Sequence, residues 1–218
     1  MKSVCLHSCA LTLMGLLGST VVMADAPAEV AAASLILQAQ TDGPLQPTQP
    51  NALHYGTPWI RVGIKSQTLV LFDPWGREQR HYVVSTARNG VGERVNSYQT
   101  PRGWHKVCEK IGDGAEANTI IFRRKVTPWK YTAQLHAEYP NKDWILSRIL
   151  WLCGEEPGKN QGGEVDSYDR AIYIHGAGEH VQWGIPTSLG CVRMQNGDVI
   201  ELFNNTSLGI DVLIDENA

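Results

Sequence analysis

Apolar and polar positions alternate along the first clearly patterned part of the chain. The stretch "WIRVGI" (59–64) alternates, and "TLVLF" (68–72) is a short apolar run. Both patterns are typical of β-strands. "DPWG" (73–76) has proline at the favoured second position of a turn, and the strand-like "HYVVST" (81–86) follows it. This order of signals predicts a β-hairpin.

The same kind of signal recurs to the end of the chain. We predict further strands at 119–124 ("TIIFRR"), 170–176 ("RAIYIHG") and 209–214 ("GIDVLI"). The segment 143–152 ("DWILSRILWL") fits a helix or a buried strand, and its bulky apolar residues favour a strand. The glycine-rich 154–163 can only be a loop.

One segment has a clear helical pattern. Residues 196–205 ("NGDVIELFNN") place Asn196 as a plausible N-cap and Asp198 in the first turn, followed by an apolar face of Val199, Ile200, Leu202 and Phe203. The elements together predict a single, mainly β domain with one or a few short helices.

The N-terminal 55 residues differ from the rest. Residues 1–24 combine Lys2, a short apolar stretch and a small-residue end, which predicts a cleaved secretory signal peptide. Residues 25–55 contain no Lys or Arg and are rich in Ala, Gln and Pro, which predicts a flexible leader with one weak helical turn near 31–38. The folded domain is expected at 56–218, with no membrane anchor left after cleavage.

Composition and charge then narrow the class of protein. Apolar residues make up 43% and charged residues 19% of the chain, as in ordinary globular proteins. The formal net charge of −3 gives no reason to expect a nucleic acid or an anionic membrane as partner.

Removal of a signal peptide would leave three cysteines, Cys108, Cys153 and Cys191. An odd number in an oxidising compartment leaves at least one thiol free or paired with another molecule. A Cys108–Cys153 disulfide is one possibility, which the sequence leaves open, and it would leave Cys191 free.

Cys191 in "SLGCVRM" is either a small core residue or a nucleophile. Gly190 permits a close approach of substrate to the backbone. The N–H groups of Leu189, Gly190 and Cys191 could converge on a developing oxyanion. The helix that begins near Asn196 could also point its positive end at the sulfur and favour the thiolate.

A thiol nucleophile needs a base, and His175 is the best candidate because it ends the apolar strand "AIYIH" and precedes Gly176. The alternative is a histidine that only caps a loop. His180, in the following loop, is a weaker rival. The remaining histidines, which we expect at the surface or in packing roles, are His54, His81, His105 and His136. No metal-ligand spacing occurs, so we expect no metal and no cofactor.

The segment "IYIHGAGEHVQWGIPTSLGCVRM" resembles the active-site segment of the L,D-transpeptidase catalytic domain family (YkuD-type domain). "IKSQTLVLFDPWGREQRHYVVST" is similar to that family's opening hairpin, "YQTPRGWHKV" to its Thr-Pro-x-Gly element, and "DVIELFNNTSLGIDVLI" to its closing helix and strand. The resemblance implies a β-sandwich-like domain. One departure is Leu189, where the family usually has histidine.

The resemblance also implies a mechanism. Cys191 is the expected nucleophile, His175 the general base and acid, and the backbone carbonyl of Gly176 the group that orients the imidazole. The substrate would be a peptidoglycan stem peptide. The acyl acceptor would be an amine of a neighbouring stem peptide, giving a 3→3 cross-link, or a lysine of an envelope lipoprotein.

Arg193 is the expected partner of a stem-peptide carboxylate, with a structural ion pair to Asp198 or Glu201 as the alternative. Three further residues are expected either to line the cleft or to pack in the protein interior: Ser188, Trp183 and Tyr173. A cysteine hydrolase of wall peptides or wall-protein linkages, and a non-catalytic wall-binding module, remain rival functions. The predicted signal peptide is consistent with a periplasmic location.

Overall fold

The computed structural model describes residues 56–218. The predicted signal peptide, the leader and the helical turn near 31–38 lie outside these residues. Within them, no helix is both long and apolar enough to cross a bilayer.

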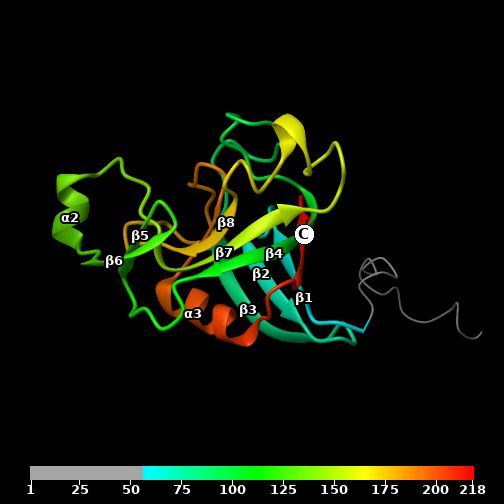
Figure 1. The fold of residues 1–218 in the computed structure, drawn as a ribbon, viewed down its shortest axis with the longest axis horizontal. Helices are drawn as coiled ribbons and strands as arrows, with labels where there is room; N and C mark the ends of the chain where they lie inside the picture. The colour runs from blue at the N-terminus through cyan, green and yellow to red at the C-terminus, as the bar shows by residue number, and fades with distance from the viewer. Residues whose placement is uncertain (1–55) are drawn as a thin grey trace, which may run out of the picture. The chain divides into compact units, whose positions relative to one another are not determined.

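Ten strands build the described part of the chain (Figure 1), and the prediction of a mainly β fold is confirmed. They are β1 (Trp59–Gly63), β2 (Thr68–Phe72), β3 (Glu78–Ser85), β4 (Gly103–Ile111), β5 (Thr119–Phe122), β6 (Lys125–Lys130), β7 (Leu146–Gly154), β8 (Tyr173–Gly176), β9 (Val192–Met194) and β10 (Asp211–Asp215). The two α-helices among residues 56–218 are α2 (Ala133–Glu138) and α3 (Asn196–Asn205), and one 3₁₀ turn, η2, spans Gly163–Val165.

Eight of the ten strands close into a barrel. Their order is β4-β10-β1-β2-β3-β9-β8-β7, and β7 pairs again with β4. The pairs β1–β10 and β8–β9 are parallel, and the other neighbouring pairs in the ring are antiparallel. Closure satisfies the backbone groups that an open sheet would leave unpaired at its edges.

All eight barrel strands contribute to one apolar core. Typical members are Ile60, Leu69, Val107 and Ile174, which are shielded from solvent, and α3 adds Val199, Leu202 and Phe203 to the same cluster. Since side chains alternate across a strand, the other residues of β7, β8 and β9 face the outside of the barrel.

The hairpin β5–β6 and the helix α2 extend from the barrel on the side of β7 and β8 (Figure 1). Ile121 of β5 packs on the outward-facing Ile149, Trp151 and Tyr173. The hairpin therefore covers part of the outer wall formed by β7 and β8.

The observed bounds of the helices and strands test the elements predicted from the sequence. The hairpin at 59–86 and the helix at 196–205 are confirmed, and 143–152 contributes a strand, as its bulky residues suggested. The N-cap prediction was wrong by one residue, because Gln195 is the cap and its side chain makes no capping bond. Three strands, β4, β6 and β9, and the short helix α2 were not predicted.

The structure decides how the cysteines of the folded domain pair, which the sequence left undecided. Cys108 of β4 and Cys153 of β7 form a disulfide with 5.8 Å between their Cα atoms, and Cys191 is free. The disulfide ties the two strands whose pairing closes the barrel.

Candidate functional site

The parallel pairing of β8 with β9 brings the candidate residues onto one face. Ile174 pairs with Val192 and His175 with Arg193. Ile174 and Val192 belong to the core, so the side chains of Tyr173 and His175 and of Arg193 lie on the outer face. Cys191 directly precedes β9 and packs in the cluster that contains Tyr173.

The position of Cys191 relative to His175 follows from this register. Cys191 lies two residues before Arg193, the partner of His175, so along an extended chain it sits diagonally from His175. With a strand spacing of about 4.8 Å and a rise of 3.3 Å per residue, this diagonal separates the two Cα atoms by roughly 8 Å. A cysteine and a histidine side chain directed toward each other can bridge that separation.

Cys191 is half-buried, and its thiol points at a backbone carbonyl. Its Sγ donates to the oxygen of Ala171 at 3.5 Å. Among residues 56–218 it makes no hydrogen bond with His175. Burial and the carboxylate of Asp143 raise the pKa of Cys191 to about 12, and the N–H of Tyr173 acts in the opposite direction.

The ring of His175 is fixed by one hydrogen bond. Its Nδ1 lies 2.9 Å from the carbonyl oxygen of Gly176. Because a carbonyl only accepts, Nδ1 must carry the proton, and Nε2 of the neutral ring then offers a lone pair. Nε2 is buried and has no partner within the described part of the chain. Burial lowers the pKa of His175, so the ring is neutral near pH 7.

The turn before Cys191 is held by a serine and a threonine. Ser188 is fully buried, and its Oγ donates to the carbonyl of Cys191 at 2.6 Å and accepts from the N–H of Gly190 at 3.2 Å. Thr100 Oγ1 donates to the carbonyl of Gly190 at 2.9 Å and accepts from the N–H of Ala87. Gly190 has φ of +134°, a conformation that side-chain-bearing residues rarely adopt.

Of the three N–H groups expected to bind an oxyanion, one is already occupied by these contacts. The N–H of Gly190 already donates to Ser188 and is not free in this conformation. No partner within residues 56–218 accepts from the N–H groups of Leu189 and Cys191. Ser188 itself shapes the turn and does not face solvent.

Arg193 forms an ion pair that the sequence did not predict. One guanidinium nitrogen lies 2.8 Å from Oδ1 of Asp143, and another lies 3.3 Å from Thr187 Oγ1. The alternatives considered from sequence were Asp198 and Glu201, and neither is the partner. Asp143 opens the apolar segment 143–152, and nothing local in the sequence marks it as part of a site.

A groove of about 370 Å³ lies over this ion pair. Its lining includes Asp143, Arg193, Leu189, Thr187 and His180. Leu189 and Arg193 lie two residues on either side of Cys191 in the sequence, but neither Cys191 nor His175 is among the residues that line the groove. Leu189, at the position where the family usually has histidine, exposes 39% of its surface.

Two other residues predicted to line the cleft, Trp183 and Tyr173, do not line this groove. Trp183 is half-buried and is not part of the lining of this groove. Tyr173 is buried and packs edge-on against Trp151, with 5.3 Å between the ring centroids, on the same face as Cys191. Tyr173 therefore forms the wall beside the thiol.

The other histidines have structural settings. His180 stacks on His136 with 3.9 Å between ring centroids and accepts from or donates to the hydroxyl of Tyr131 at 2.9 Å. His105 is buried and bonded on both ring nitrogens, and His81 is an exposed partner of Glu78. His54 lies outside the described residues.

The helix α3 does not point its N-terminus at the thiol. It starts beyond β9, at the opposite end of that strand from Cys191, and the amide of Asn196 bonds to Asn118 and to the carbonyl of Ala177. Helix dipole effects fall off within one turn, so α3 does not favour the thiolate. Within residues 56–218 no three His, Cys, Asp or Glu side chains gather in a way that could hold a metal ion.

Comparisons with known proteins show to which family the chain is similar. The model of the YkuD family, described as the L,D-transpeptidase catalytic domain, matches residues 57–214. The probable L,D-transpeptidase YbiS of Escherichia coli K12 is 28% identical over 151 residues, which cover 63% of this chain and 48% of that protein. The probable L,D-transpeptidase ErfK/SrfK of Salmonella typhimurium is 26% identical over 125 residues, which cover 57% of this chain and 35% of that protein. The chain thus spans about half or less of the length of these relatives.

Solved structures were also matched. L,D-transpeptidase 3 from Mycobacterium tuberculosis is 16% identical with a TM-score of 0.45, over 73% of this chain and 61% of that one. The L,D-transpeptidase from Xylanimonas cellulosilytica is 19% identical with a TM-score of 0.42, over 81% of this chain and 68% of that one.

Proposed function

Because the chain belongs to the YkuD family of L,D-transpeptidase catalytic domains, we propose that it transfers acyl groups of peptidoglycan stem peptides through a thioester on Cys191. The observation that carries the proposal is the unpartnered Nε2 of His175, buried on the same face as the only free thiol of the described residues. A buried acceptor without a partner costs free energy, which a catalytic base explains.

The pKa directions define the resting state of this pair. The pKa of Cys191 is raised and that of His175 is lowered, so both groups are neutral before substrate binds. In the proposed mechanism the thiol turns from Ala171 toward Nε2 and transfers its proton as sulfur attacks the carbonyl carbon. His175 therefore acts as a general base during attack rather than as one half of a preformed ion pair.

The N–H groups of Leu189 and Cys191 are the proposed donors to the tetrahedral oxyanion. In other enzymes the loss of one such donor costs about 3 kcal/mol of transition-state stabilisation. His175 then returns its proton to the leaving amine of the terminal D-alanine, which leaves a thioester. An amine of a second stem peptide, or a lysine of an envelope lipoprotein, attacks the thioester and releases the cysteine.

Arg193 is the proposed partner of a substrate carboxylate. Asp143 now occupies the guanidinium, so a substrate carboxylate would replace one carboxylate by another at the same planar group. Such an exchange keeps the cation neutralised both before and after binding.

A periplasmic location is part of the proposal. The Cys108–Cys153 disulfide favours an oxidising compartment, where disulfides persist. This agrees with the signal peptide predicted at 1–24.

Incubation of the protein with purified disaccharide-tetrapeptide, followed by mass spectrometry, tests the function. A dimer that has lost one alanine supports transfer, a tripeptide monomer without dimer indicates a hydrolase, and unchanged substrate contradicts both. Cys191→Ser and His175→Gln should abolish the product, whereas His81→Gln, at an exposed histidine, should not. Labelling by a carbapenem that disappears in Cys191→Ser locates the acyl-enzyme.

A further inference from the structure

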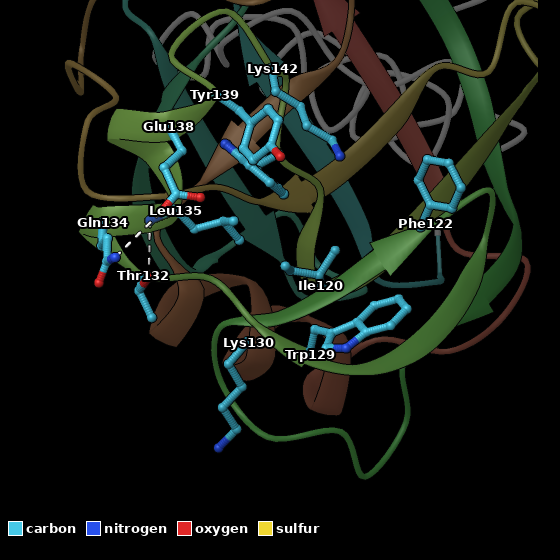
Figure 2. A pocket seen from close by; sticks show the side chains of 11 residues that line it. Ile120, Phe122, Trp129, Lys130, Thr132, Gln134, Leu135, Glu138, Tyr139 and Lys142 are labelled. Carbon is cyan, nitrogen blue, oxygen red and sulfur yellow. Dashed lines mark hydrogen bonds between the residues drawn. The ribbon is translucent and has the colours of Figure 1, made fainter.

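A second and larger groove lies away from the thiol, between the hairpin β5–β6 and the helix α2. Its volume is about 590 Å³. Figure 2 shows Ile120, Phe122 and Trp129 on the hairpin side, and Gln134, Leu135 and Glu138 on the helix side. None of the candidate catalytic residues lines it.

The groove displays aromatic rings to solvent. Trp129 exposes 66%, Tyr139 54% and Phe122 52% of its surface, while Trp144 is buried beneath them. Contact of apolar ring surface with water is unfavourable, so three exposed rings around one hollow indicate a surface that binds a ligand.

Polar groups surround these rings. Gln134, Glu138, Lys130 and Lys142 belong to the lining, and the ammonium of Lys142 lies 4.4 Å from the ring centroid of Trp144. A wholly apolar occupant would bury these groups without hydrogen bonds, at a cost in free energy. The lining therefore fits a ligand with both an apolar face and hydroxyl or amide groups, which is the surface of a pyranose sugar.

The two grooves meet at one turn. Lys142 lines both of them, and the next residue, Asp143, forms the ion pair with Arg193. A polymer with a sugar backbone and peptide branches can therefore lie with its sugars between β5–β6 and α2 while a branch enters the groove over Asp143 and Arg193.

We propose that the groove between β5–β6 and α2 binds the sugar backbone of the wall polymer whose peptide branch reaches Cys191. This inference rests on the proposed function for the identity of the polymer. The binding itself is a property of Trp129, Phe122 and Tyr139, and can be measured without turnover.

Binding of β-1,4-linked N-acetylglucosamine hexamer, and of glycan strands freed of peptide, should be followed by calorimetry and by NMR on the whole protein. Trp129→Ala should weaken binding by on the order of tenfold. Trp75→Ala is the matched control, because Trp75 is 67% exposed on the β2–β3 turn and should leave binding unchanged. Equal unfolding midpoints for both variants show that the fold is intact.

Kinetics provide the second measurement. Trp129→Ala should raise KM for disaccharide-tetrapeptide several-fold and leave kcat, and all parameters for the sugar-free tetrapeptide, unchanged. The inference is overturned if the unaltered protein binds neither glycan, if Trp75→Ala weakens binding as much as Trp129→Ala, or if only apolar peptides bind. Glycan binding without any turnover would instead remove the proposed function and keep the glycan site.

Discussion

At the scale of single residues, the two ring nitrogens of His175 differ because only one of them faces a carbonyl. Gly176 sets the tautomer, and the register of β8 with β9 sets the face on which the free nitrogen lies. The pKa of Cys191 depends on the charges around it, of which Asp143 is the one that most opposes the thiolate.

Asp143→Asn tests that influence. Loss of the carboxylate removes a charge that raises the pKa of Cys191, so the pH profile of iodoacetamide alkylation should move to lower pH. At neutral pH the alkylation rate should rise about three- to tenfold. Asp113→Asn, at an exposed aspartate, is the control and should show no shift. A profile moved to higher pH would contradict this electrostatic account.

Gly176→Ala tests the close packing behind the histidine. An added Cβ would lie 2.6 Å from the carbonyl oxygen of Leu146 and 2.5 Å from Oδ1 of Asn196, so backbone must shift. We expect a loss of about 1–3 kcal/mol in the free energy of unfolding, measured with urea. Gly197→Ala, whose Cβ would meet nothing within 4 Å, should cost far less.

At the scale of elements, β7 connects the barrel closure, the candidate site and the hairpin β5–β6. It pairs with β4, which closes the barrel, with β8, which contains His175, and with β5, which lines the groove between β5–β6 and α2. The Cys108–Cys153 disulfide joins β7 to β4 across 45 residues of chain.

Removal of this disulfide should weaken barrel closure. For a loop of this length, chain-entropy arguments give about 4 kcal/mol of stabilisation. Cys108→Ala with Cys153→Ala should therefore lower the free energy of unfolding by about 2–4 kcal/mol, measured by guanidinium titration. Dithiothreitol should lower the stability of the unaltered protein and leave that of the double variant unchanged. Equal stability of both proteins would show that closure does not depend on the disulfide.

The elements also show where local patterns suffice. The hairpin β2–β3 and the helix α3 follow from alternation and helical periodicity. Strand β6 was missed because Pro128 argues against a strand, and a proline is tolerated here because β6 lies at the edge of the sheet. The helix α2 has only six residues and no buried side chain, so no periodic face could show in the sequence.

At the scale of the whole molecule, the barrel buries histidines in the neutral form. Burial lowers the pKa of His105 from 6.5 to about 4, and it lowers the pKa of His175 in the same direction. The unfolded chain therefore binds protons that the folded chain does not, and stability must fall as pH drops below 6.5.

His105→Gln tests this acid sensitivity. The contribution of His105 is fully present above pH 6.5 and is lost as pH falls toward 4, by about 3 kcal/mol in the free energy of unfolding. Urea unfolding at pH 7 and pH 4 should thus show a smaller acid loss in His105→Gln than in the unaltered protein. His81→Gln should keep the full loss, and an unchanged slope in His105→Gln would refute the account.

The sequence by itself determined most strand positions, the helix α3, the choice of Cys191 and His175 as candidates, and the family resemblance that agrees with this choice. These features depend on preferences that act over a few residues, or on residue types that stand close together in the chain. Only the tertiary structure decided that Asp143 pairs with Arg193, that Cys108 pairs with Cys153, and that Lys142 joins two grooves. Such contacts depend on strand register and barrel closure, which bring together residues that no local pattern connects.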